Sequence, residues 1–589
     1  MAICLTAAML FGGAVPPVTS AGEDYYDATD KVDAVPAAAE TRSNQVITLP
    51  AIFADKMVFQ RQKPMNVFGF SQYNGSTVRV TLGDEILEAE IANGEWSVSF
   101  PSREAAKGLT MTVEAVGVEN SLITVKDIDI GELWLASGQS NASFSPYQME
   151  DFNEYLLNAD NFDNIRLYRQ SGAVSVLTDK IGNGSWYKVD SSCISKGGPA
   201  NGFMSAIGYV VATKLAAELG DEVTVGIINA ARGSTTIKTW MSPEFIENCG
   251  NDTYTKRYNA YKEFYEKNGR EPTSTDECSE YVAGKLHVNV PCVSYNEMIA
   301  HLDGFNIRGV IWYQGCGDSG NPSEYRVFFE ALQNEFRRVF GNDSTLPFFV
   351  VQLAPYGNDH SDFDAMQYML TEELNDTYVV STGIEGSPFS EPDYHHSDTR
   401  GVHPSRKSPV GDRIASSILH NVYSIEEETD TESPRLLSAT RGTAGIITLT
   451  FDKELTHLYG EAVGAANSVI GFELKDQKDG LWYPAFGKID LNDRTKIVVY
   501  NSGISKATAL RYGFGFSYIE TSDGRLYAFD STRSSYTSSE YTFVDLAGNT
   551  HIFKPDDGSV IRTIKNGNIA STDGTPLLVF EVSLPYTTE

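Results

Sequence analysis

The fold of this chain is decided by one stretch of sequence, IDIGELWLAS at residues 128–137. The stretch is nearly continuously apolar, which is typical of a strand buried on both faces of a parallel sheet. Similar apolar stretches follow at residues 223–229, 307–314, 347–354 and 377–383, and helical patterns lie between them. Strands that alternate with helices predict a parallel sheet covered on both faces, with an active site beyond the carboxyl ends of its strands.

Three helical patterns support this interpretation. Apolar residues recur at helical spacing from Phe203 to Leu219 and from Tyr325 to Val339, and each run is followed by a glycine. A third pattern runs from Val410 to His420. We expect all three to pack on the sheet.

The regions on either side of this part alternate with period two instead, as strands with one buried face do. Residues 45–126 contain three such runs and an Asn93-Gly94 hairpin turn, and the period-two pattern returns after about residue 423. We therefore predict an N-terminal β-domain at 45–126, a catalytic α/β domain at 127–424 and a C-terminal β-domain at 425–589.

The beginning of the chain has the composition of an export signal. Residues 1–22 are apolar and end in small residues suited to signal peptidase, although a basic start is missing. A lipid anchor or an ordinary apolar tail remains the alternative. We predict a signal peptide at 1–22, a linker at 23–44, and a secreted or cell-surface protein.

Charge and cysteine content narrow the class of protein further. The 589 residues include 46 Lys+Arg and 78 Asp+Glu, a net charge of −32, which argues against a nucleic-acid partner. No later run approaches the roughly 20 apolar residues of a membrane span. Outside the leader the five cysteines lack zinc-site or redox spacing, and they allow one disulfide, for example Cys278–Cys292.

Polar residues follow the first three predicted strands. Ser140 comes directly after Gly138-Gln139, where a nucleophile would project from the sheet edge, although a serine there could equally cap the next helix. Gly233 follows the second strand and Gln314 ends the third. The amides of Ser140 and Gly233 and the side chain of Gln314 could form a three-donor oxyanion hole.

The candidate general base is His403, which lies in a loop just before the predicted helix at Val410. His395 and His396 precede it, and the remaining histidines fall inside predicted elements, where a structural role is expected. A competing nucleophile is Ser319, in the sequence GDSGNP at residues 317–322, which is similar to the serine motif of trypsin-like proteases. That fold is all-β, so its context does not match.

Taken together, these blocks resemble the sialate O-acetylesterase family within the SGNH hydrolases. The resemblance is carried by GELWLASGQSN at 131–141, IWYQG at 311–315 and HPSRK at 403–407. It spans about residues 49–415, with weaker support as far as residue 513. It implies a flavodoxin-like three-layer domain and a serine esterase that removes O-acetyl groups from sugars, typically sialic acids. By the resemblance Ser140 is the nucleophile, His403 the base, and Gly233 and Gln314 complete the oxyanion hole, without a cofactor or metal.

The chain departs from the family pattern at two positions. Cys316 stands where many relatives have glutamate, and Arg400 stands three residues before the histidine, where many SGNH enzymes have aspartate. We assign Asp398 as the acid that orients His403, with Asp318 or a backbone carbonyl as alternatives.

The sequence also leaves alternatives open for the function of the protein and for its substrate. A plant-polysaccharide acetylesterase, such as one acting on acetylated xylan, and a degenerate carbohydrate-binding protein both fit the same residues. A sialate carboxylate would need an arginine, for which Arg232, Arg400 and Arg406 are the candidates. The sequence leaves the oligomeric state open.

Overall fold

The computed structural model describes most of the chain after residue 45. The described residues are 46–170, 177–199, 204–270, 272–282, 285–354, 360–382, 402–425, 432–457, 468–514, 516–521, 526–530, 535–536, 541–544, 550–553, 560–565 and 569–587. The predicted signal peptide and linker, and Asp398, lie outside these ranges.

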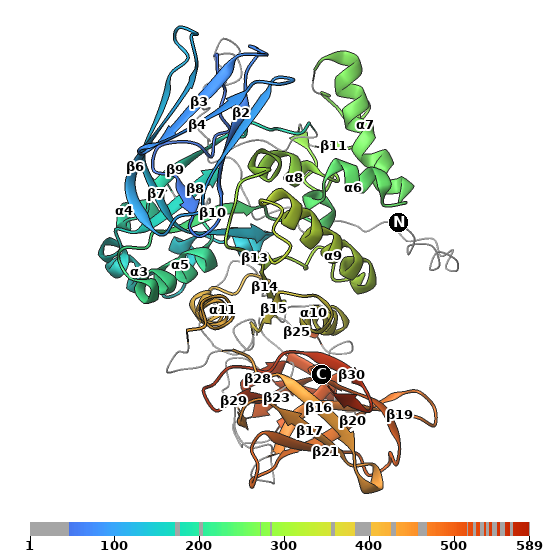
Figure 1. Cartoon of the computed structure of the whole chain (residues 1–589). Helices are drawn as coiled ribbons and strands as arrows, with labels where there is room; N and C mark the ends of the chain where they lie inside the picture. Colours follow the sequence, from blue (N-terminus) through green and yellow to red (C-terminus); the bar gives the residue numbers. More distant parts are fainter. Residues whose placement is uncertain are drawn as a thin grey trace.

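A parallel sheet occupies the middle of the molecule (Figure 1). In the described chain its strands pair in parallel in the order β8-β10-β7-β13-β14-β15, and β9 pairs antiparallel with β8 at one edge. Without β8 and β9, the strands stand in chain order 2-1-3-4-5, the order of flavodoxin-like folds. The strands are β7 Ile123–Gly138, β8 Ile165–Gln170, β9 Gly184–Lys188, β10 Val225–Ala231, β13 Gly309–Tyr313, β14 Phe348–Val351 and β15 Thr377–Val380.

Helices cover the sheet on two sides. Helix α5 packs against α11, and α9 against α10, while α10 and α11 lie on opposite sides of β14 and β15 (Figure 1). The four are α5 Ala206–Leu219, α9 Pro322–Val339, α10 Ser361–Glu373 and α11 Ser408–Tyr423. Local signals set the ends of α5, because the Ser205 hydroxyl accepts from the Gly208 N–H at 3.1 Å and Gly220 ends the helix at φ 82°.

Further helices lie in the connections between these elements. They are α2 Ser140–Ser143, α3 Phe152–Asn158, α4 Ser191–Ile194, α6 Pro243–Asn248, α7 Asp252–Asn268 and α8 Val293–Met298.

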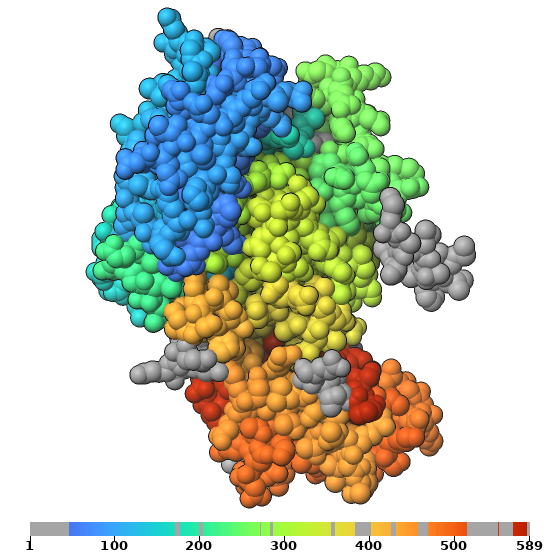
Figure 2. All heavy atoms as spheres, in the orientation of Figure 1, coloured from blue at the N-terminus to red at the C-terminus, as the bar shows by residue number. Residues whose placement is uncertain are grey.

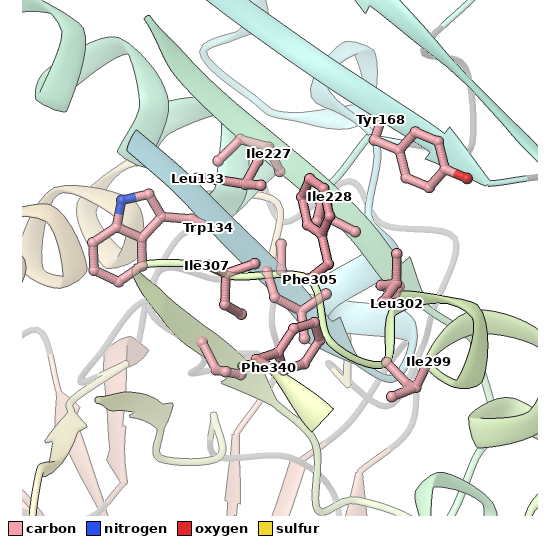
Figure 3. Packing of buried hydrophobic residues seen from close by; sticks show 14 of the residues in the cluster. Leu133, Trp134, Tyr168, Ile227, Ile228, Ile299, Leu302, Phe305, Ile307 and Phe340 are labelled. Carbon is pink, nitrogen blue, oxygen red and sulfur yellow. The ribbon is translucent and has the colours of Figure 1, made fainter. Parts of the chain in front are cut away.

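Large apolar side chains from neighbouring strands form the core of this central part. Leu133 and Trp134 of β7 and Ile227 and Ile228 of β10 are fully buried, and Phe340 packs in the same region (Figure 3). Burial on both faces explains why the strands are almost continuously apolar.

In the described residues most N-terminal strands join the central sheet through β7, whereas β2 and β5 form a separate two-stranded sheet. The first half of β7 pairs antiparallel with β6, and its second half lies between β10 and β13. One strand therefore crosses the predicted boundary between residues 126 and 127. The other strands are β1 Val58–Gln60, β2 Met65–Phe70, β3 Thr77–Leu82, β4 Glu85–Glu90, β5 Glu95–Phe100 and β6 Ala106–Ala115.

A buried charge cluster ties these N-terminal strands to the central sheet. Glu132 of β7 is fully buried and forms ion pairs with Arg61, which follows β1, and with Arg308, which precedes β13. The Gln60 amide also donates to Glu132, at 3.0 Å.

An antiparallel β-domain forms the C-terminal part, at the bottom of Figures 1 and 2. Its main sheet has the order β30-β22-β19-β20-β21-β17-β16-β31. These strands are β16 Leu436–Arg441, β17 Ile447–Phe451, β19 Ser468–Asp476, β20 Trp482–Ile489, β21 Lys496–Tyr500, β22 Ala507–Tyr512, β30 Phe580–Ser583 and β31 Tyr586–Thr587. Smaller sheets hold β18 Leu455–His457, β23 Phe516–Thr521, β24 Leu526–Asp530, β25 Ser535–Tyr536, β26 Tyr541–Val544, β27 Thr550–Phe553, β28 Val560–Lys565 and β29 Ile569–Ser571, and a separate central hairpin holds β11 Tyr281–Val282 and β12 Lys285–Leu286.

Hydrogen bonds between a side chain of the central part and the backbone of this domain join the two beside α10. The Gln352 side chain donates to Val579 O and accepts from Val579 N, both at 3.1 Å. The prediction of a parallel α/β part followed by a C-terminal β part is thus confirmed.

The disulfide Cys278–Cys292 is not formed. Both residues are buried free cysteines, Cys278 before β11 and Cys292 at the start of α8.

Candidate active site

The candidate residues after the first three strands meet at one edge of the sheet. Gly138, the last residue of β7, is the register partner of both Ala231 of β10 and Tyr313 of β13. Ser140, Gly233 and Gln314 follow these positions by one or two residues. The carboxyl ends of adjacent parallel strands therefore bring the three together, as the sequence pattern predicts.

A glycine and a glutamine shape the turn that carries Ser140. Gly138 has φ 132°, and a Cβ there would lie 2.2 Å from Tyr313 O, so only glycine allows this close approach. The Gln139 N–H donates to Tyr313 O, and its side-chain oxygen accepts from the Gly315 N–H, both at 3.0 Å. The turn before Ser140 is thus fixed to the end of β13.

Ser140 and His403 lie in direct contact. The Oγ of Ser140 is 2.7 Å from Nε2 of His403, across 263 positions of sequence. Ser140 is 8% exposed at the start of α2, and His403 is half-buried in the segment before α11. A hydroxyl and an imidazole at this distance can share a proton.

Gln314 is buried and held by its neighbours. Its Nε2 donates to Asp318 Oδ2 at 2.7 Å and to Thr235 O at 3.0 Å, so both of its hydrogens are engaged within the protein. To serve an oxyanion, the amide would have to release one of these bonds. Its role as an oxyanion donor stays a prediction.

Asp318 belongs to a structural network around Gln314. Its carboxylate also accepts from the Ile237 N–H at 2.8 Å and from Lys238 Nζ at 3.2 Å. Burial raises the pKa of Asp318, and Lys238 opposes that rise. Among the described residues Asp318 has no hydrogen bond to His403, so the structure gives no support to Asp318 as the orienting acid.

Gly233 lies in the turn after β10, beside a half-buried ion pair. Arg232 donates from Nη2 to Glu297 Oε2 at 2.5 Å, so its charge is balanced within the protein. Burial raises the pKa of Glu297, and Arg232 opposes that rise. Arg406 is exposed, three residues after His403, whereas Arg400 lies outside the described residues.

The remaining candidates are placed as follows. The predicted acid Asp398, together with His395 and His396, lies outside the described residues. Ser319 Oγ donates to the Cys316 carbonyl at 3.3 Å. His301 is fully buried, and burial lowers its pKa to about 4, as expected of a structural histidine.

Two side chains that the sequence analysis passed over lie beside the Ser140–His403 pair. Asn141 and Lys407 are both buried and hydrogen-bond each other. Both lie inside the sequence blocks that carry the family resemblance, and that position is the one signal that could have identified them.

The described residues contain neither a metal-binding cluster nor a membrane-spanning helix. No group of three His, Cys, Asp or Glu side chains in those ranges is arranged to hold a metal ion. No helix within them is long and apolar enough to cross a membrane.

Comparison with known proteins gives a consistent family assignment. Residues 284–419, which include Gln314 and His403 but not Ser140, match the family model described as carbohydrate esterase, sialic acid-specific acetylesterase. The chain is 23% identical over 508 residues to sialate O-acetylesterase of Mus musculus, covering 79% of this chain and 89% of that protein. It is 25% identical over 334 residues to the enzyme of Rattus norvegicus, covering 52% of this chain and 60% of the relative.

A solved structure agrees in fold. The carbohydrate acetylesterase from Xanthomonas citri matches with a TM-score of 0.65 and 23% identity, over 92% of this chain and 100% of that one. The chain is therefore a hydrolase of the carbohydrate esterase type, and it is similar to the sialic acid-specific acetylesterase family.

Proposed function

We propose that this carbohydrate esterase is a secreted serine esterase of the SGNH type that removes O-acetyl groups from sugars through an acetyl-enzyme. The observation that carries the proposal is the 2.7 Å distance between Ser140 Oγ and His403 Nε2 at the carboxyl edge of the sheet. The apolar leader at 1–22 supports export.

The mechanism uses the two side chains in turn. Ser140 Oγ attacks the acetyl carbonyl carbon while Nε2 of His403 takes the hydroxyl proton. When the tetrahedral intermediate collapses, the C–O bond to the sugar breaks and the imidazolium returns the proton to the leaving sugar hydroxyl. Water, deprotonated by His403, then attacks the acetyl-Ser140 ester. The bond between the acetyl carbon and Ser140 Oγ breaks, the imidazolium returns the proton to Oγ, and acetate leaves. Atoms and charge balance without a cofactor.

Backbone amides are proposed to stabilise the oxyanion. In the described residues neither the Ser140 N–H nor the Gly233 N–H has a hydrogen-bond acceptor, which supports both as donors. One such donor contributes roughly 3 to 4 kcal/mol to transition-state stabilisation. Gln314 would add a third donor if it released Thr235 O, and Asp398 would orient His403.

The proposed substrate is an O-acetylated sialic acid. The support comes from the names of the relatives, which are sialate O-acetylesterases. Arg406 is exposed close to His403 in sequence, and its charge is suited to a sialate carboxylate.

The test is acetate release by the purified protein from an aryl acetate, O-acetylated sialosides and acetylated xylo-oligosaccharides. We expect Ser140→Ala to lower kcat/KM by more than about 10³-fold on every ester that the wild type cleaves. Ser319→Ala, at the competing serine, should keep wild-type activity. The substrate assignment fails if the xylo-oligosaccharides are the better esters.

Two results would contradict the proposal. Full activity of Ser140→Ala, with activity lost in Ser319→Ala, would identify the other serine as nucleophile. Sugar binding without turnover by the wild type would identify a degenerate binding protein.

A further inference from the structure

A lysine is buried beside the Ser140–His403 pair, and no carboxylate among the described residues pairs with it. Lys407 is 0% exposed, and its Nζ donates to Asn141 Oδ1 at 2.6 Å. The amine lies over the rings of Phe144, at 4.7 Å, and Tyr313, at 5.6 Å. Among the described residues no carboxylate forms an ion pair with it.

The other end of the Asn141 side chain reaches the histidine segment. Its Nδ2 donates to Val402 O at 2.9 Å, and Val402 is the residue before His403. Asn141 is also the residue after Ser140 and is 1% exposed. One buried amide therefore connects the backbone beside the nucleophile to the backbone beside the base.

Lysine at position 407 determines which way this amide faces. A protonated amine only donates and a carbonyl oxygen only accepts, so the charged form of Lys407 selects the Asn141 oxygen and leaves the Asn141 nitrogen for Val402 O. A flipped amide would put NH₂ against the amine and oxygen against oxygen. The lysine thus holds Asn141 in the orientation that binds the histidine segment.

We propose that Lys407 is a positioning residue that holds His403 on Ser140 through Asn141. The inference deepens the proposed function and rests on it. His403 lies in an irregular segment between Val402 and the start of α11 at Ser408, so side-chain bonds have to define where its ring stands. A general base displaced by about 1 Å can lose about 10²-fold in rate.

The chemistry of the position supports this role over simple packing. Burial lowers the pKa of Lys407 to about 7, an effect that the Cys316 thiol on the loop after β13 only partly opposes. Other titratable side chains in this region are Tyr313, on β13, and His403, on the same segment as Lys407. The carboxylates of Glu150 and Asp151 also lie nearby, and they accept from the hydroxyls of Ser405 and Ser408. A methionine would fill a similar space without an amine to desolvate, so packing alone does not call for lysine.

The test is a double-mutant cycle with Lys407→Met and Asn141→Leu, assayed on the aryl acetate. We expect Lys407→Met to lower kcat about 10²-fold while KM stays within about twofold, because alignment and not binding is lost. If Lys407 acts through Asn141, the double variant has the same kcat as Asn141→Leu alone. Lys214→Met is the matched control, since Lys214 donates to Ser416 Oγ at 2.7 Å on α11 and should keep wild-type kcat.

Two outcomes overturn the inference. One is wild-type kcat in Lys407→Met, and the other is a double variant whose loss is the product of the two single losses. If a single variant does not fold, the double variant decides, because it leaves neither a buried amine nor a buried amide unpaired. A folded double variant with wild-type kcat contradicts the inference.

The proposed function and this inference fail separately. Full activity of Ser140→Ala removes the proposed function and the inference with it. An inactive Ser140→Ala beside a fully active Lys407→Met removes the inference alone.

Discussion

Two lysines near the same edge of the sheet, Lys238 half-buried and Lys407 fully buried, have opposite environments. Lys238 forms ion pairs with Asp318, at 3.2 Å, and Glu324, at 3.1 Å, and lies over the rings of Tyr254 and Phe328. Lys407 also lies over two rings, but its polar partner is the neutral side chain of Asn141.

The difference in partners separates their pKa values. Burial lowers the pKa of Lys238, but the charges of Asp318 and Glu324 outweigh burial and hold it above its usual value. At Lys407 burial prevails, and its pKa falls to about 7. A lysine between carboxylates is a fixed positive charge that stabilises the loops around it, whereas a lysine bonded to an amide can lose its proton near neutral pH.

The largest expected effect tests the structural side of this comparison. Asp318→Ala leaves Lys238, Gln314 and the Ile237 N–H without their shared acceptor, and we expect it to lower the free energy of unfolding by about 3 kcal/mol. Urea denaturation measures the change. The control is Glu88→Ala on β4, which breaks an exposed ion pair with Arg79 of β3 and should leave stability nearly unchanged. Equal losses in the two variants would show that Asp318 is no more structural than a surface charge.

A second prediction uses pH to compare the two lysines. Between pH of about 7 and 10.5 the unfolded chain binds a proton on Lys407 that the folded protein does not, so Lys407 makes stability rise with pH by up to about 1.4 kcal/mol per unit. Below pH 7 the lysine is charged in both states and this slope vanishes.

Denaturation of two variants across this range isolates that slope. The stability difference between Lys407→Met and wild type should change steadily with pH from about 7 to 10, and that of Lys238→Met should stay constant, because the raised pKa keeps Lys238 charged throughout. Two parallel curves would show that the Lys407 pKa is not lowered.

The smallest expected effect concerns activity. In Asp318→Asn we expect kcat/KM of the folded enzyme to fall less than about 10-fold, since in the structure this carboxylate binds Gln314 and Lys238 and not His403. Loss of an acid that orients the imidazole would cost roughly 10⁴-fold. Asp398→Asn, at the predicted acid, is the companion variant and should lose more than Asp318→Asn. The reverse order would restore Asp318 as the orienting acid.

Local patterns in the sequence predicted much of the fold. The apolar runs became β7, β10, β13, β14 and β15, and the three helical patterns became α5, α9 and α11. The meeting of Ser140, Gly233 and Gln314 followed from one rule, that adjacent parallel strands end at one edge. His403 was selected as a loop histidine before a helix, and the structure places it in contact with Ser140.

Other features could not be predicted from the sequence because they depend on which distant segments come into contact. Asp318 looked available as an acid, but its partners Ile237 and Lys238 come from the segment after β10, some 80 positions earlier. The domain boundary predicted between residues 126 and 127 lies within β7. The first half of β7 pairs with β6 and the second half with β10, and the sequence of a strand does not show which strands it will pair with. The Cys278–Cys292 disulfide is absent for the same reason, because cysteine spacing in the sequence does not show which thiols folding brings together.

The sequence by itself determined the alternation of strands and helices, the turn that carries Ser140 and the family that the chain resembles, since periodicity, glycine turns and short motifs are local properties. Only the tertiary structure decided the partners of the buried charges, with carboxylates at Lys238 and an amide at Lys407. Whether a buried lysine keeps its proton depends on groups that folding brings within a few ångströms of it, and spacing along the chain does not reveal them.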